Sequence, residues 1–585
     1  MDKDVEKSIG LGQWQETTQS CEDDIGKSRR TEEAEFADED AEKPNIVKGD
    51  DSDGHVNWSK RQILATLSLS GLYVGSQLPL LLGAGSLPYI VKDIGGSTID
   101  SWFPVAYSLA MASVSPFSGY LQDVFGRRNI ALVGGSILCV GIIVVATSHT
   151  MGQAIVGMAL SGLGAAIGEL TALAGTSELV PVKRRGLYLG AVTGCVLPFS
   201  PYAIYTTLLG THSTWRWGFW IPLMWNGLAV TGIALTYWPH SQLRAERKTF
   251  WEILPQIDFV GGLLSTGGLT LFLVGVTAGG NLAPWASARV LCPLIFGVAL
   301  VVVFAVWEWK FASFPMLPHE LFAGQRVVAM SFLVAFISGI YFYAILNFGP
   351  VIYLDIYNPD PVKAGIKGVI ISLGVTAGAV IPNMLLSVYK TRQREILATC
   401  AVLATAFGTA LVTTTPDNPV RTVAFCTISG FGIGAIVACA LTTAVTAAPD
   451  NIIATCVALS LSIRTVGGSV GTAVNSNVLD SKLKKNLPMY IAEYAIAAGL
   501  PTSSATAFVE LYLTAPAKLS NGAVPGVTAA VMQGAVIGAR WAYAESLKYV
   551  WYTMLPFGIL SCAACLGLGN VGKFMTNRIA ANIRH

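Results

Sequence analysis

The sequence GYLQDVFGRR, residues 119–128, lies between two long apolar segments and decides the fold of this chain. A short charged segment in this setting belongs at a membrane surface, because charged side chains are costly in the hydrocarbon core. It places Asp123 four residues before Arg127, and its two glycines mark points where backbones can come close. Read alone, the segment is also consistent with an ordinary basic loop on the cytoplasmic side.

The order G-x-L-x-D-x-x-G-R-R resembles the loop between the second and third helices of the major facilitator superfamily. Two positions depart from the usual pattern: Gln122 stands where a small residue is common, and Val124 where a basic residue is common. The loop therefore carries less positive charge than is usual in that superfamily. The resemblance implies a charge latch between the two halves of a rocking transporter, made by Gly119, Asp123, Gly126, Arg127 and Arg128.

The composition is that of a polytopic membrane protein. Of 585 residues, 52% are hydrophobic and only 13% are charged, and the mean hydropathy is +0.55, which excludes an ordinary soluble domain of this size. Residues 1–55 differ from the rest, since they hold 17 of the 36 acidic residues and only 7 of the 38 Lys and Arg. We predict a disordered acidic tail there, because it has too little apolar surface to offset its ordering entropy.

Fourteen apolar runs of about 20 residues follow the tail, each long enough to cross a bilayer. With the tail in the cytoplasm, the inner loops carry thirteen Lys and Arg and the short outer loops six. This bias predicts that both termini are cytoplasmic. We expect the plasma membrane, with a vacuolar or vesicle membrane as the alternative.

An internal repeat divides the apolar part of the chain. Gly162 and Gly164 recur as Gly430 and Gly432, and Pro181 recurs as Pro449, always 268 residues later. We therefore predict an all-α major facilitator fold with two six-helix bundles and two inserted helices. The expected parts are the acidic cytoplasmic tail (1–58), the first bundle (59–240), the inserted pair with its cytoplasmic linker (241–310), five helices of the second bundle (311–478), an extracellular loop (479–549), and the last helix with a cytoplasmic tail (550–585).

Glu169 is the most informative single residue. It lies about 18 Å from the cytoplasmic end of its predicted helix, and that helix carries no basic residue. A carboxylate at this depth is costly unless it is protonated, paired or facing a water-filled cavity. We predict that Glu169 is the proton-coupling site, and a structural carboxyl is the alternative.

Further polar residues at membrane depth are candidates for a substrate cavity, although each is also explained by helix packing. Arg464 is the deepest cation, and it could pair with a carboxylate across the cavity or hold the two halves together. The predicted cavity residues are Tyr73, Gln77, Tyr343, Asn347, Asn383 and Arg464. We assign close helix packing to Gly162, Gly164, Gly190, Gly194, Pro198, Gly467, Gly468 and Gly471.

Several longer segments look like the fungal trichothecene efflux pump family, a neighbour of the siderophore-iron transporters. They are ELTALAGTSELVPVKRRG (169–186), WRWGFW (215–220), DFVGG (258–262) and SIRTVGGSVGTA (462–473). The resemblance implies export of a sesquiterpenoid or related fungal toxin by proton antiport, with proton-coupled uptake of a ferric siderophore as the alternative. Met158 occupies the place of an arginine found in many drug antiporters, which leaves Glu169 as the candidate for proton transfer.

A polytopic membrane enzyme is the alternative from another class, and the histidines argue against it. The six histidines are scattered, and none of them forms a pair with metal-ligand spacing. We expect no catalytic residues, no metal and no cofactor. The expected partners are a small-molecule substrate, protons and the lipid bilayer, with no nucleic acid; the sequence specifies no oligomeric state.

Overall fold

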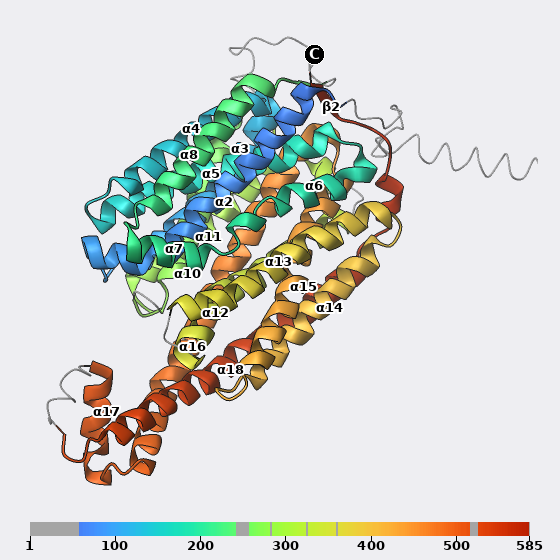
Figure 1. The fold of residues 1–585 in the computed structure, drawn as a ribbon. Coiled ribbons are helices and arrows are strands. Elements are labelled where there is room, and N and C mark those ends of the chain that lie inside the picture. The colour runs from blue at the N-terminus through green and yellow to red at the C-terminus, as the bar shows by residue number, and fades with distance from the viewer. Residues whose placement is uncertain are drawn as a thin grey trace, which may run out of the picture. The chain divides into compact units, whose positions relative to one another are not determined.

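The computed structural model describes residues 58–241, 257–280, 283–322, 326–357, 361–514 and 524–583. The expected acidic tail and most of the linker before the inserted pair lie outside these residues. The remainder is almost entirely helical (Figure 1). We call residues 58–241 the first half and residues 326–583 the second half.

The first half contains seven helices, and two of them share one membrane crossing. The sequence predicts a single span over 186–209, but the structure breaks it at Leu197–Phe199, because Pro198 and Pro201 remove two backbone donors. Side-chain caps start two of the helices: Ser59 accepts from Gln62 N, and Thr150 accepts from Gln153 N. The helices are α2 (Lys60–Ile94), α3 (Trp102–Phe125), α4 (Arg127–Ala146), α5 (Met151–Leu179), α6 (Arg185–Gly194), α7 (Tyr202–His212) and α8 (Trp217–Thr236).

The second half shows the repeat found in the sequence. Its α15 (Pro419–Ala447) has 29 residues, as α5 does, and both ends are displaced from those of α5 by 268 residues. A short 3₁₀ turn follows each of the two helices with the same displacement. The other helices are α12 (Arg326–Val351) with a π-helical turn (Ile352–Tyr357), α13 (Pro361–Val388), α14 (Gln393–Ala410), α16 (Ile453–Ala497), α17 (Ala505–Thr514) and α18 (Ala529–Leu566).

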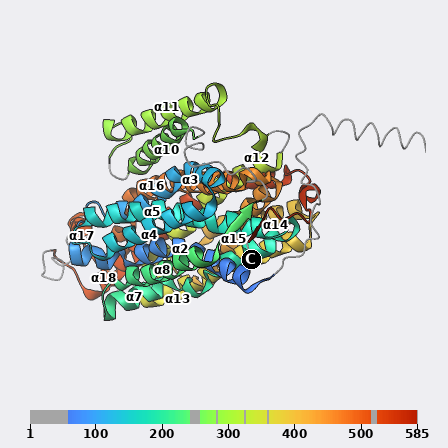
Figure 2. The same ribbon diagram turned by 90° about the horizontal axis from the view of Figure 1, so that it is seen from above.

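Two further helices, α10 (Phe259–Ala278) and α11 (Ala288–Lys310), form the inserted pair. They pack on each other, and α10 also contacts α3 and α16. Figure 2 shows them outside the two halves, next to these helices. Since α11 exposes Val298, Val302 and Val303, its outer face suits contact with lipid acyl chains.

Helix replaces much of the loop expected at residues 479–549. The helix α16 runs on to Ala497, and α18 begins at Ala529, well before the expected residue 550. These extensions and α17 bury a small core of their own that includes Ile491, Phe508 and Val531. This core lies away from the main bundle, at the end marked by α17 in Figure 1. Hydropathy alone therefore does not show where α16 ends and where α18 begins.

Thirteen helices of the described residues are long and apolar enough to cross a membrane, with α6 and α7 counted as one. The helix α3 is not among them, since it carries Ser108, Ser113, Ser115, Ser118 and Asp123, but it packs between α5 and α16 and has 24 residues. When α3 is added to these thirteen, the described residues contain fourteen helices that are long enough to cross a membrane.

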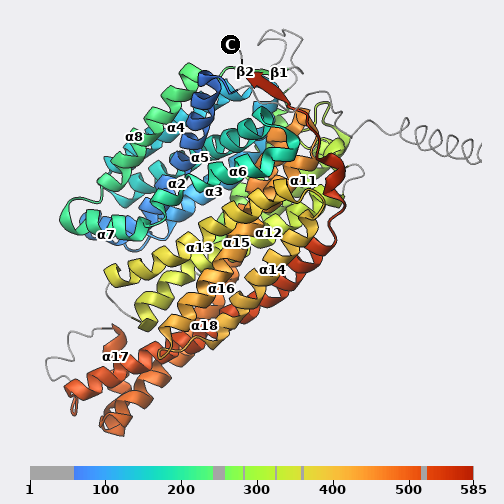
Figure 3. The ribbon, with the colours of Figure 1, turned by 45° about the vertical axis from the view of Figure 1, so that its right-hand side comes forward.

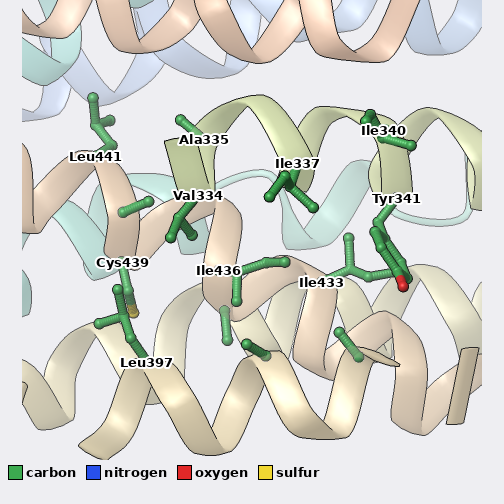
Figure 4. Close-up of a cluster of buried hydrophobic side chains, with 14 of the residues drawn as sticks. Val334, Ala335, Ile337, Ile340, Tyr341, Leu397, Ile433, Ile436, Cys439 and Leu441 are labelled. Atoms are coloured by element: carbon green, nitrogen blue, oxygen red, sulfur yellow. The ribbon is translucent and has the colours of Figure 1, made fainter. Parts of the chain in front are cut away.

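The main hydrophobic core lies mostly in the second half and also includes Leu170, Leu173, Ala174, Leu189 and Val192 of the first half. Figure 4 shows α12, α14 and α15 meeting through side chains such as Ile337, Leu397 and Ile436, all with 1% or less of their surface exposed. The described residues also contain one two-stranded sheet, in which β1 (Pro239–Ser241) pairs antiparallel with β2 (Ala581–Ile583) (Figure 3). We call the end of the bundle that carries this sheet and the Gly119–Arg128 segment the latch end.

Candidate functional site

A charged pair joins the two halves inside the bundle. Glu169 on α5 has no exposed surface, and its Oε1 lies 3.1 Å from Nη2 of Arg464 on α16. The other carboxylate oxygen accepts a hydrogen bond of 2.8 Å from Gln77 Nε2 on α2. Both carboxylate oxygens are therefore partnered, and one of the partners belongs to the opposite half.

The two charged groups enter from the same end and reach the same depth. Glu169 lies ten residues before the end of α5, and Arg464 lies eleven residues after the start of α16. At a rise of 1.5 Å per residue these positions are about 15 and about 17 Å from the latch end. A charge at this depth requires compensation, and each residue supplies it to the other.

Tyrosines surround this pair. Tyr73 and Tyr343 are close enough for electrostatic interaction with both charged groups. Tyr343 on α12 also donates a hydrogen bond of 3.4 Å to Ser108 Oγ on α3, which is a second polar contact between the halves. The structure therefore brings together four of the predicted cavity residues with the predicted proton site: Tyr73, Gln77, Tyr343 and Arg464.

The other two predicted cavity residues lie elsewhere. Asn347 is exposed and donates to Thr472 Oγ1 at 3.0 Å, so it joins α12 to α16 within the second half. Asn383 is 1% exposed and lies near the latch end, where its backbone faces Gly186 of α6. The sequence alone does not place Asn347 and Asn383 relative to Glu169, because their positions depend on how α12 and α13 pack against the other helices.

Asp123 binds the start of α16 across the two halves. Its carboxylate accepts from Ala454 N at 3.2 Å, and from Thr455 N and Thr455 Oγ1 at 2.8 Å each. The first turn of a helix has unpaired N–H groups and a partial positive charge, so a carboxylate is favoured there. The segment predicted to form the latch thus contacts a helix N-terminus of the second half.

The two arginines of the segment do different things. Arg127 is 5% exposed, lies 3.6 Å from Asp123 and forms an ion pair with Glu178 at the end of α5. Arg128 donates instead to Ala234 O at 2.7 Å, and its guanidinium lies 3.5 Å from the ring centre of Trp238. In this structure the hydrogen bond and the ring contact of Arg128 therefore join α4 to the end of α8, within the first half.

A further contact between the halves lies at the latch end, beside that of Asp123. Arg185 at the start of α6 has no exposed surface and donates to Val445 O at 3.0 Å. Its Nη2 lies 3.5 Å from Asp450, which follows α15. Asp450 also pairs with Arg578 at 2.8 Å. Arg185 and Asp450 thus join the halves by an ion pair, whereas Asp123 joins them by contact with the N-terminus of α16.

Glycines allow the halves to touch at the latch end. A Cβ on Gly119 would overlap Ala458 of α16 and would lie 3.0 Å from Ala454 O. A Cβ on Gly186 would overlap the carbonyl oxygen of Asn383 on α13. Gly126 has a φ of 96°, a conformation that a side chain disfavours, and it separates α3 from α4. The absence of a side chain at Gly119 and Gly186 therefore lets the two halves approach closely at this end.

The predicted packing glycines lie at crossings of two helices. Gly162 faces the backbone of α3, Gly164 that of α4, Gly467 and Gly471 that of α12, and Gly468 the ring of Tyr343. Gly190 and Gly194 face Val380 of α13, which belongs to the opposite half, and Pro198 lies in the break between α6 and α7. Most of these glycines therefore serve packing within a half, whereas Gly190 and Gly194 contact the other half.

Sequence reasoning missed three charged residues of the latch end. Glu178 and Arg185 lie in the segment ELVPVKRRG, which supports the family resemblance and, through its basic residues, the loop orientation, but predicts no contact between the halves. Asp450 follows Pro449, in the place that Val182 takes in the first repeat, so comparison of the repeats could have singled it out.

Comparison with known proteins gives the family. The sequence profile described as fungal trichothecene efflux pump matches residues 49–585. The chain belongs to this family. The predicted relationship and the all-α major facilitator fold are thereby confirmed, and the chain is a multi-pass membrane protein.

Individual relatives are more distant. The efflux pump dotC of Dothistroma septosporum is 32% identical over 345 residues, which cover 56% of this chain and 57% of that protein, so the match spans little more than half of the relative's length. The trichothecene efflux pump TRI12 of Fusarium sporotrichioides is 25% identical over 529 residues, which cover 89% and 88%. The solved proton:xylose symporter XylE has a TM-score of 0.49 and 13% identity, and the match covers 88% and 98%.

Proposed function

We propose that this protein is a secondary active transporter that exports a fungal toxin, a trichothecene-like sesquiterpenoid or a related secondary metabolite, in exchange for protons. The observation that carries the proposal is the pair of Glu169 and Arg464, which joins the two halves at the depth where transporters of this architecture bind substrate and ions. Family membership supports export of a small molecule.

The pair supplies a coupling chemistry. Glu169 attracts Arg464 only while its carboxyl is ionised, so a proton that binds there removes the attraction and leaves Arg464 charged. Substrate oxygens that accept hydrogen bonds from Arg464, Gln77 or Tyr343 then replace the carboxylate as its partners. Proton and substrate therefore influence each other's affinity by linkage, as exchange requires.

The residues around the pair suit an apolar substrate with several oxygens. Gln77, Tyr73 and Tyr343 are partly exposed beside the pair and offer an amide and two hydroxyl groups between aromatic surfaces. Such a combination binds a largely apolar molecule and fixes its orientation by a few hydrogen bonds. A sesquiterpenoid with ring oxygens and hydroxyl groups has this chemistry.

The experiment is transport of a radiolabelled trichothecene into inside-out membrane vesicles under an imposed pH difference. We expect uptake by vesicles that carry the protein, and loss of the response to pH in Glu169→Gln, since this side chain cannot exchange a proton. Glu308→Gln is the matched control, because Glu308 is also a buried carboxyl (8% exposed) but lies on the inserted pair. A Glu169→Gln protein that still responds to pH as the wild type does refutes the coupling role.

A second set of measurements tests the direction of transport and the coupling role of Glu169 and Arg464. If intact cells instead gain ferric siderophore through the protein, export is the wrong direction. The double variant Glu169→Gln with Arg464→Gln should transport no worse than the worse single variant, because the two side chains act as one unit. Additive losses would show that the pair is not the coupling element.

We also propose that the protein lies in the plasma membrane with the latch end and both termini in the cytoplasm. The excess of Lys and Arg in the loops of that end supports this orientation. A membrane-impermeant maleimide applied to intact cells should label Glu510→Cys on α17 and leave Lys573→Cys unlabelled. The reverse pattern would invert the topology.

A further inference from the structure

The segment after α18 connects the two halves at the latch end. Residues 568–575 lie on the second half, where Leu568 and Val571 are each 3% exposed within its main core. Met575 Sδ lies 3.7 Å from Gln393 Nε2 at the start of α14. This first part of the segment is therefore anchored to the half from which it comes.

The rest of the segment lies on the first half. Thr576 O accepts from Lys183 N at 3.1 Å, and Arg578 O accepts from Val182 N at 3.2 Å, both in the turn between α5 and α6. Lys183 Nζ donates to Asn577 Oδ1. Beyond these contacts β2 pairs with β1, which follows α8. Figure 3 shows this course from the end of α18 to β1.

We propose that residues 570–583 form a releasable strap that holds the latch end closed. The proposal rests on the proposed function in one respect, namely that the two halves move apart at this end during transport. Val182 and Lys183 belong to the first half and Gln393 to the second, so a strap fixed to both halves opposes their separation. The strap must release from one half each time the latch end opens.

The contacts indicate which side releases. On the second half the strap and the residue just before it bury Val571 and Leu568 within a continuous core, and Phe574 packs against this core. On the first half it is held by hydrogen bonds and a sheet of three residue pairs, whose backbone groups water can satisfy after separation. The contacts with the first half are therefore the ones that break.

Arg578 explains how the buried carboxylate of Asp450 tolerates opening. In this structure Asp450 has two guanidinium partners, Arg185 of the first half and Arg578 of the strap. When the halves separate, Arg185 moves away with the first half. Arg578 stays with the second half and keeps Asp450 paired, so opening leaves no unpaired buried charge, which would be strongly destabilising.

Two engineered disulfides separate the possible modes of release. His240 and Asn582 are partners in the β1 and β2 register, so His240→Cys with Asn582→Cys ties the strap to the first half. A Cβ on Gly572 would lie 3.7 Å from Thr391 Cα, so Thr391→Cys with Gly572→Cys ties it to the second half. The second pair is the matched control, because it constrains the same strap without joining the halves.

Opening is measured without knowledge of the substrate. Ser462 Oγ on α16 donates to Ala112 O on α3 at 2.7 Å and is 3% exposed, so Ser462→Cys is shielded while the halves touch. Alkylation of this cysteine by a small maleimide, read by mass spectrometry in the purified full chain, reports separation of the halves. We expect the disulfide to the first half to slow alkylation by about tenfold or more, with recovery after reduction. The disulfide to the second half should leave the rate within about twofold.

Each other result has a definite meaning. The strap would be overturned by equal rates with both disulfides, by slowing with the control disulfide alone, or by failure of His240→Cys to cross-link with Asn582→Cys. If Ser462→Cys is never alkylated in the protein without disulfides, the halves do not separate, and it is the proposed transport cycle that fails.

Discussion

Replacing Asp123 by alanine should open the latch end, and the structure gives the expected size. Asp123 accepts three hydrogen bonds from Ala454 and Thr455 at the N-terminus of α16. Only contacts between the halves shift the balance of open and closed states, because contacts within one half persist in both. The ion pair of Asp123 with Arg127, which lies within the first half, is therefore left out of the estimate.

The magnitude follows from helix capping. Loss of a capping side chain costs about 0.5–2 kcal/mol, and loss of a negative charge near a helix N-terminus adds about 0.3–1 kcal/mol. The closed state should therefore lose about 1–3 kcal/mol, which raises the open population about 5- to 150-fold. Asp123→Asn retains an acceptor and loses only the charge, so it should raise that population about two- to fivefold.

The assay is alkylation of Ser462→Cys in each background, under conditions in which reclosing is faster than alkylation, so that the rate follows the open population. Asp93→Ala is the control, since Asp93 pairs with Arg216 at 2.8 Å and with Trp215 at 2.9 Å inside the first half. The reasoning is refuted if Asp123→Ala is alkylated no faster than Asp93→Ala, or if Asp123→Asn exceeds Asp123→Ala.

Three further substitutions test other contacts of the latch end. Gly119→Ala should favour the open state, because its Cβ overlaps Ala458, and adding Ala458→Gly should restore most of the closed population in the same alkylation assay. Arg128→Ala should lower the free energy of unfolding by about 1 kcal/mol, because the guanidinium no longer stacks on Trp238. It should leave the alkylation rate of Ser462→Cys unchanged, and a large change in that rate would place Arg128 in the latch. Arg185→Gln should leave folded yield on size-exclusion chromatography near that of the wild type, because Arg578 still pairs with Asp450. Arg185→Gln with Arg578→Gln should lower the yield, because the buried carboxylate then has no guanidinium partner; equal yields of the single and double variants contradict this.

The residues of the central pair could be predicted from the sequence, and pairing with a carboxylate was one of two possibilities for Arg464, but the sequence could not decide between them. Glu169 and Arg464 stand out because each is a charge deep in an apolar run. They are separated by 295 residues, and whether they meet depends on how α5 is packed against α16. No pattern along either helix fixes that register, because it is set by tertiary contacts such as those of Gly119 and Gly162.

The contacts of the latch could likewise be predicted only in part from the sequence. The motif predicts that Asp123 contacts the other half, but its partner is a set of backbone N–H groups, which have no residue signature. It also cannot separate Arg127 from Arg128, because adjacent residues on a helix point about 100° apart and only one can face Glu178. The sequence predicts shorter helices than the observed α16 and α18, because the extensions of these helices bury a separate small core of modest hydropathy.

The repeat and the central pair together constrain how this sequence can diverge. Val437 stands 268 residues after Glu169, so the second half carries no acid at the matching place and supplies the base instead. A substitution that neutralises one member leaves the other charged and unpaired in a medium of low polarity, which is costly. Loss of both charges together avoids this cost. Among homologous chains, acid at the first position and base at the second should therefore be inherited or lost as a couple.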